Sequence, residues 1–173
     1  VNGEGVEANL KKAAKYFKNA ADNGNIDGMN NYGFLLDKGG EDFPINKKEA
    51  AKYYKMAADK GNTSAMNNYG FMLKFGEGVD IDKKEAARYY KMAADLGDTE
   101  AMNNYGQMLK DGDGIDADKK EAARYYKLAA DLGVVKAMFN YGYLLEKGIG
   151  VDVDAIESAR YYKMGVEKRK SMS

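Results

Sequence analysis

The chain has 173 residues, and its 27 lysines and arginines balance 27 aspartates and glutamates, so it carries no net charge. It is long enough to bury a sizeable core, and its many helix formers, with Pro44 as the one proline, favour an all-α protein. The balanced charge argues against a nucleic-acid partner, and the lack of cysteine and histidine removes the usual ligands of a metal site.

A short motif that ends in Tyr-Gly recurs at residues 29–33, 66–70, 102–106 and 138–142. A second set of glycines, Gly24, Gly61, Gly97 and Gly133, is spaced by 37, 36 and 36 residues. This period, with one insertion, predicts a single array over residues 1–173. We expect a half repeat over residues 1–24, then repeats over about 25–61, 62–97, 98–133 and 134–173, as a fragment of a longer protein.

The first predicted element is a helix over about residues 10–23, preceded by Gly3-Glu4-Gly5, which we interpret as a loop. It matches the second helix of the later repeats and has no first helix of its own. Its unpaired side predicts a surface for end-to-end self-association.

Each full repeat then begins with a helix that we name helix A, represented by residues 64–75. Its apolar residues recur at i, i+3, i+4 and i+7, which builds one buried face. A Gly-x-Gly pair that starts at Gly76 is expected to end the helix, because glycine readily adopts a left-handed backbone. The mid-helix Gly70 costs about 1 kcal/mol relative to alanine, which predicts close contact with a tyrosine of the next helix, here Tyr90.

The second helix, helix B, follows Asp82 and is expected to run for roughly fourteen residues with one apolar stripe. Asp82 is predicted to cap the first-turn amides while Glu85 reaches back to the amide of the cap, as in a capping box. In the last copy Gly165 and Val166 replace two alanines. This copy is therefore expected to fray or to form an end.

The order of Tyr69-Gly70, Gly76-Glu77-Gly78 and Tyr89-Tyr90 resembles the Sel1-like repeat, a relative of the tetratricopeptide repeat. The resemblance covers nearly the whole chain and implies an all-α, right-handed α-α superhelix (solenoid) of about four helix hairpins plus an N-terminal half repeat. It also implies a scaffold or adaptor that binds proteins. Cysteine-rich members of the family have been linked to β-lactam binding, but this chain has neither cysteine nor a Ser-x-x-Lys tetrad.

In tetratricopeptide-like arrays the A helices line the concave face, so the resemblance implies that their non-buried sides contact a ligand. Carboxamides there can satisfy an extended peptide, and exposed aromatics can supply apolar pockets. The candidate ligand contacts are Asn30, Phe34, Asn67, Phe71, Lys74, Asn103, Gln107, Lys110, Phe139 and Tyr143. The structural alternative is that the asparagines, Asn68 and Asn104 included, bond between repeats and that neighbouring helices partly cover the phenylalanines.

The leading functional hypothesis is therefore a scaffold that binds a protein or peptide on the concave face. The alternatives are an architectural spacer or self-associating array, or a non-catalytic region fused to a catalytic domain outside this chain. No nucleophile–base pair or phosphate loop is present, so we predict no catalytic residue and no cofactor.

The acidic residues 111–118 lack the EF-hand glycine and glutamate and are expected to form a capped loop, not a metal site. No apolar run is long enough for a membrane partner, and the absence of cysteine favours the cytoplasm.

Overall fold

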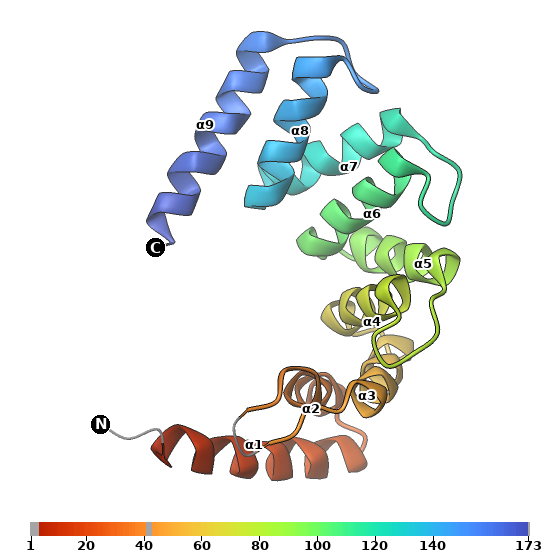
Figure 1. The fold of residues 1–173 in the computed structure, drawn as a ribbon, viewed down its shortest axis with the longest axis vertical. Helices are drawn as coiled ribbons and strands as arrows, with labels where there is room; N and C mark the ends of the chain where they lie inside the picture. Colours follow the sequence, from red (N-terminus) through yellow and green to blue (C-terminus); the bar gives the residue numbers. More distant parts are fainter. Residues whose placement is uncertain (1–3, 41–42, 173) are drawn as a thin grey trace. The chain divides into compact units, whose positions relative to one another are not determined.

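The computed structural model describes residues 4–40 and 43–172, with the side chains from residue 10 onward (Figure 1). Within these residues the chain forms nine α-helices and no strand beyond an isolated bridge between Gly40 and Phe43. The helices are α1 (Glu4–Asp22), α2 (Ile26–Lys38), α3 (Lys47–Asp59), α4 (Thr63–Phe75), α5 (Lys83–Asp95), α6 (Thr99–Asp111), α7 (Lys119–Asp131), α8 (Val135–Lys147) and α9 (Ala155–Ser171). The even-numbered helices are the A helices, and the odd-numbered ones are the B helices. The all-helical content confirms the all-α prediction.

The chain divides into two compact units, Val1–Tyr89 and Tyr90–Ser173, which we name unit 1 and unit 2. Unit 1 holds α1 to α4 and the start of α5, and unit 2 holds the rest of α5 and α6 to α9. Within each unit, consecutive helices pack on one another, as Figure 1 shows for α1 to α4 and for α6 to α9. This is the packing of a solenoid, in which each hairpin buries its apolar face against its neighbours.

In α3, α7 and α9, two tyrosines of helix B pack on the preceding helix A. In the first hairpin, the rings of Tyr32 and Tyr53 meet edge to face at 4.8 Å, a favourable aromatic geometry. The ring of Tyr54 lies over Gly33, where an added Cβ would be only 3.0 Å from it. The predicted reason for the mid-helix glycine is therefore confirmed in this hairpin. The same contacts recur in unit 2 as Tyr105 with Tyr125, Tyr141 with Tyr161, Gly106 with Tyr126, and Gly142 with Tyr162.

A Gly-x-Gly loop follows α4, α6 and α8, and in each unit one such loop contacts the helix B that precedes it. Gly76 has φ +72°, and its amide donates to the Met72 carbonyl, as predicted for a left-handed helix end. Gly78, at φ +74°, lies so close to the main chain of Lys47 that a Cβ would overlap it. In unit 2, Gly150 lies against the main chain of Lys119 in the same way. The second glycine of the loop therefore allows main chain to touch main chain between repeats.

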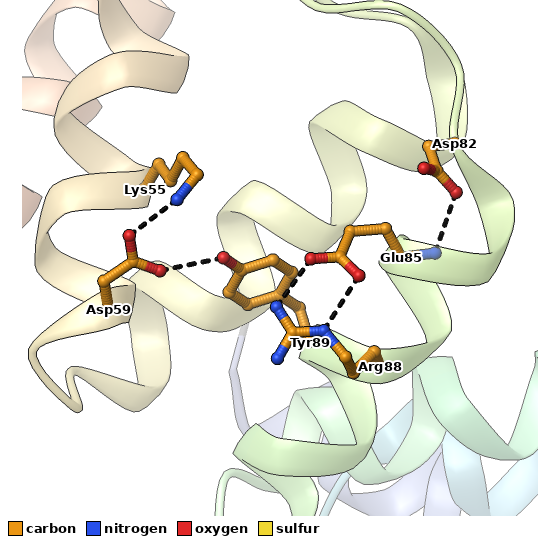
Figure 2. Close-up of polar contacts among 6 residues, drawn as sticks. All are labelled: Lys55, Asp59, Asp82, Glu85, Arg88 and Tyr89. Carbon is orange, nitrogen blue, oxygen red and sulfur yellow. Dashed lines mark hydrogen bonds and ion pairs between the residues drawn. The ribbon is translucent and has the colours of Figure 1, made fainter.

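Helix B begins at its predicted cap, but only half of the predicted capping box forms. The Glu85 amide donates to Asp82 Oδ1 at 2.9 Å (Figure 2). The Asp82 amide donates to the Leu73 carbonyl of α4 at 3.0 Å, and the Glu85 carboxylate pairs with Arg88. The prediction that Glu85 reaches back to the amide of Asp82 is wrong, because the Leu73 carbonyl of helix A already accepts a hydrogen bond from that amide.

One further prediction fails at the first helix, and one of two alternatives is excluded at the last: of fraying and forming an end, the structure excludes fraying. α1 begins at Glu4 rather than near residue 10, so Gly5 is helical and the loop predicted there is wrong; Gly3 lies outside the described residues. A single glycine costs a helix only about 1 kcal/mol, which its other residues can offset. α9 continues to Ser171 and does not fray at Gly165, since the Phe139 ring lies 3.0 Å from where a Cβ of Gly165 would be.

Neighbouring B helices are joined by a hydrogen bond between tyrosine and aspartate. The Tyr89 hydroxyl donates to Asp59 Oδ1 at 2.9 Å, Lys55 donates to Oδ2 at 2.6 Å, and Arg88 covers the Tyr89 ring (Figure 2). The hydrogen bonds from Lys55 and Tyr89 hold the pKa of Asp59 below its ordinary value. In unit 2 the contact recurs as Tyr125 with Asp95 at 3.1 Å and Tyr161 with Asp131 at 2.6 Å.

Candidate functional site

The predicted ligand contacts of unit 1 include exposed aromatic rings. Phe34 on α2 is 48% exposed and Phe71 on α4 is 43% exposed. Phe75, which was not among the predicted contacts, is 54% exposed, and its ring lies 4.6 Å from that of Phe71. Lys74 lies over the Phe75 ring at 5.5 Å. We name Phe34, Phe71 and Phe75 the aromatic patch. Exposed rings on neighbouring elements are typical of a surface that binds another molecule.

The predicted contacts of unit 2 are mostly engaged within the unit. Asn103 is buried, and its Oδ1 accepts a hydrogen bond from Asn140 Nδ2 at 2.9 Å, which is the inter-repeat bond of the structural alternative. Gln107 Oε1 accepts the Tyr126 hydroxyl at 2.9 Å. The remaining three are Lys110, paired with Asp111 at 3.3 Å, Phe139, packed near Tyr162 and Arg169, and Tyr143, which is 44% exposed.

A cavity of about 160 Å³ lies beside the aromatic patch in unit 1. It is lined by the end of α2, the middle of α3 and the middle of α4 and is open to solvent. Its lining residues are Asp37, Lys38, Tyr54, Asn67, Asn68, Phe71 and Met72. The cavity brings together the predicted contacts Asn67 and Phe71 from one helix and adds groups from two others.

Tyr54 is the lining residue that sequence reasoning missed, because its position in the repeat indicated only packing. A signal was present in the alignment of the repeats. Tyr126, its equivalent, bonds Gln107, whose place in the first repeat is taken by Phe34. Because Phe34 cannot accept a hydrogen bond, the Tyr54 hydroxyl needs a different acceptor.

Asp37 supplies a buried carboxylate to the cavity wall and is 9% exposed. Lys47 Nζ lies 2.5 Å from its Oδ1, and Lys38 Nζ lies 2.8 Å from its Oδ2. Burial raises the pKa of Asp37, but the hydrogen bonds from Lys38 and Lys47 outweigh it and leave the pKa below its ordinary value. Lys47 also pairs with Glu77 at 2.7 Å. The carboxylate is therefore ionised at neutral pH and compensated by two lysines.

A second cavity, of about 360 Å³, lies in unit 2 at the start of α7 beside Gly150 and Val151. Arg124 and Lys127 line it, but Arg124 pairs with Glu121 and Lys127 with Asp131, each at 2.7 Å. Their charges are thus already compensated by carboxylates of the same helix. A related crevice in unit 1 is lined by Lys48, Gly78 and Val79 among others. Both depend on how the Gly-x-Gly loop lies against the preceding helix, which the sequence pattern did not predict.

The acidic residues 111–118 form the loop that we predicted. Gly112 ends α6 in a left-handed conformation, and Asp118 caps α7 by accepting the Glu121 amide at 2.9 Å. In residues 4–40 and 43–172, no group of three or more histidine, cysteine or acidic side chains is arranged to hold a metal ion. Nor does any helix in the part of the chain that the structure describes combine the length and apolar character needed to cross a bilayer.

Comparisons with known proteins agree with this repeat architecture. The family model described as Sel1 repeat matches the chain at residues 1–25, 26–62, 63–98, 99–134 and 135–168. A comparison with curated proteins gives no match.

The solved structures that are similar to the chain include the following three. A Sel1 repeat protein from Oxalobacter formigenes is 28% identical with a TM-score of 0.82, and the match covers 90% of this chain and 63% of that one. The protein c5321, a protective antigen of uropathogenic Escherichia coli strains with an SLR fold, is 27% identical at a TM-score of 0.82, over 91% of this chain and 36% of that one. Cysteine rich protein B of Helicobacter pylori is 26% identical at a TM-score of 0.61, and the match covers 79% of this chain and 97% of that one. The chain therefore spans less than two thirds of the length of the first two proteins.

Proposed function

The chain belongs to the Sel1 repeat family, whose members are generally protein-interaction scaffolds, and we propose that it binds an extended segment of another protein on the exposed face of its A helices. Within that face, the aromatic patch of unit 1 and the cavity beside it are the proposed centre of the contact. The segment would lie across α2 and α4.

The observation that carries this proposal is the exposure of the adjacent Phe71 and Phe75 rings at a cavity with polar walls, with Phe34 exposed on the neighbouring helix A. Fully burying one phenylalanine side chain stabilises a complex by about 1.5–3 kcal/mol, so this patch can supply much of the affinity of a short peptide. Aromatic anchors beside a pocket are also typical of the residues that dominate binding energy at protein interfaces. The neighbouring Asn67 and Asn68 add carboxamides that match the donors and acceptors of a peptide main chain.

The chemistry of the cavity supports binding without catalysis. Burial and the negative charge of Asp37 raise the pKa of Tyr54, so its hydroxyl stays protonated at neutral pH and is a poor base. Asp37 is held by Lys38 and Lys47 and has a lowered pKa, so it is also a weak base. We therefore propose a scaffold rather than an enzyme for this region.

The experiment is a selection of binding peptides from a random display library, followed by calorimetric affinities for the selected sequences. The double variant Phe34→Ala with Phe71→Ala removes two rings that are about half exposed, so the fold should persist. We expect it to weaken binding at least tenfold, which corresponds to about 1.4 kcal/mol.

Tyr143→Ala is the matched control, because Tyr143 occupies the equivalent repeat position in unit 2 and is similarly exposed. It should leave affinity within twofold of the original chain. Equal binding by the double variant and the original chain would refute the proposed location, and failure to select any peptide would refute the scaffold proposal itself.

A further inference from the structure

The second tyrosine of helix B is hydrogen-bonded differently in α3 of unit 1 than in α7 and α9 of unit 2. In unit 2, the Tyr126 hydroxyl donates to Gln107 Oε1 at 2.9 Å, and the Tyr162 hydroxyl donates to Glu146 Oε2 at 3.0 Å. Both acceptors lie on the A helix of the same hairpin. Tyr54 of unit 1 is 1% exposed, and none of the described residues accepts a hydrogen bond from its hydroxyl.

The substitutions on α2 explain this difference. Phe34 stands at the repeat position of Gln107 and offers no acceptor. Asp37 stands at the position of Glu146 but is one methylene shorter, and Lys38 and Lys47 hold its carboxylate. Tyr54 lines the cavity, and Asp37 forms part of the same wall.

A second polar group of the same cavity also has no partner in unit 1. The bond between Asn103 and Asn140 joins consecutive A helices in unit 2, and the equivalent pair in unit 1 is Asn30 with Asn68. This pair is not hydrogen-bonded. Among the described residues, the buried Oδ1 of Asn30 has no hydrogen-bond partner, and the Asn68 side chain forms no hydrogen bond. Asn68 instead lines the cavity. Polar groups in this state favour a ligand that completes their hydrogen bonds.

We propose that the unit 1 cavity binds the side-chain carboxamide of a glutamine or asparagine in the ligand segment. The inference rests on the proposed function and specifies the chemistry of its anchor residue. The amide oxygen accepts the Tyr54 hydroxyl, as Gln107 does for Tyr126, and the amide nitrogen donates to Asp37 or to Asn68 Oδ1. The volume of about 160 Å³ is roughly five times the ~30 Å³ that a water occupies, so a carboxamide fits.

The charges around the cavity favour a neutral amide over an ion. A ligand carboxylate would be repelled by Asp37, which is ionised and buried. A ligand ammonium would compete with Lys38 and Lys47 for the same two oxygens. A carboxamide has both a donor and an acceptor and adds no charge to the site. An apolar residue next to it in the segment would then lie on the aromatic patch.

The test uses the peptides selected for the proposed function and asks which residue they share. We expect one position to be enriched in glutamine or asparagine, and its replacement by leucine or glutamate in a synthetic peptide to weaken binding about five- to tenfold. Tyr54→Phe removes only the hydroxyl and keeps the ring over Gly33. With this variant, the advantage of the glutamine peptide over the leucine peptide should be largely lost, because the amide oxygen no longer has its donor.

Tyr126→Phe is the matched control, since it removes an equivalent hydroxyl that the chain already satisfies, and it should leave the glutamine preference unchanged. Thermal melting of both variants verifies that they fold. Selected peptides that show no carboxamide preference, or a preference that survives Tyr54→Phe, would overturn this inference and leave the scaffold proposal standing. Equal weakening of all peptides by Tyr54→Phe would indicate a main-chain amide in the cavity and would also overturn it. No selected peptide at all would reject both proposals.

Discussion

Unit 1 and unit 2 share the contacts that join their repeats but differ on the exposed face of their A helices. Unit 2 satisfies that face with its own side chains, through Asn103 with Asn140 and Gln107 with Tyr126. Unit 1 presents exposed phenylalanines and, next to them, the unpartnered hydroxyl of Tyr54. The difference shows that substitutions at two repeat positions, phenylalanine for glutamine and aspartate for glutamate, remove the internal acceptor of a buried tyrosine next to exposed aromatic rings.

The contacts common to both units lie on the loop and on the B helices. The second glycine of the Gly-x-Gly loop touches the preceding helix in each unit, through Gly78 and Gly150. The tyrosine–aspartate bond between B helices also occurs in both. These contacts maintain the array, and the A-helix face is therefore free to vary from repeat to repeat.

The largest effect is expected from breaking what the units share. Gly78→Ala and Gly150→Ala should each lower the free energy of unfolding by about 3 kcal/mol or more, because a Cβ would overlap the main chain of the preceding helix B and because both glycines have positive φ. Urea unfolding monitored by circular dichroism measures the loss.

Gly61→Ala is the matched control, since Gly61 has φ +95° but nothing within 4 Å of the added Cβ. Its loss should be limited to the backbone strain of about 1–2 kcal/mol. If all three variants lost the same free energy, the contact between main chains would not be what stabilises the join.

A medium effect is expected from the asparagines that distinguish the units. Asn103→Leu should cost about 1–3 kcal/mol, because it leaves Asn140 Nδ2 without its acceptor in a partly buried place. Asn30→Leu should be neutral or stabilising, because its buried Oδ1 has no hydrogen bond among the described residues. Chemical denaturation of the two variants compares them directly. Equal destabilisation by both would show that unit 1 satisfies Asn30 after all.

The smallest effect concerns acid stability and the charge cluster of unit 1. The folded-state pKa of Asp37 lies below its ordinary value of 3.8, so its stabilising charge is present above that pH and is lost as pH falls through the folded pKa. Lys47→Met should lower the free energy of unfolding at neutral pH by about 1 kcal/mol or less, since Lys47 is partly exposed. The difference from the original chain should shrink as pH falls below about 4.

Lys119→Met, at the equivalent position of unit 2, is the control, because no described residue forms an ion pair with this exposed lysine. It should have little effect at either pH. Unfolding curves at neutral and acidic pH provide the measurement, and a Lys47→Met difference that persists in acid would contradict the role of Asp37.

Much of the fold follows from the amino-acid sequence alone. The 36-residue period, the helix ends at Gly76 and its equivalents, and the cap of helix B at Asp82 are properties of residues close together in the chain. The contact between a mid-helix glycine and a tyrosine repeats with the period and was predictable for the same reason. Local conformational preference and apolar spacing determine such features before any tertiary contact forms.

The partners of individual polar side chains were decided only by the tertiary structure. Glu85 bonds Arg88 because Leu73 of another helix takes the cap amide, and Asn103 is internal because Asn140 of the next repeat reaches it. The candidate site depends on the same kind of coincidence, since Tyr54, Asp37 and Asn68 come from three helices. Which hydrogen bonds form within the chain, and which groups remain for a ligand, depends on differences of about an ångström in the spacing between helices. The sequence pattern of one repeat does not contain that information.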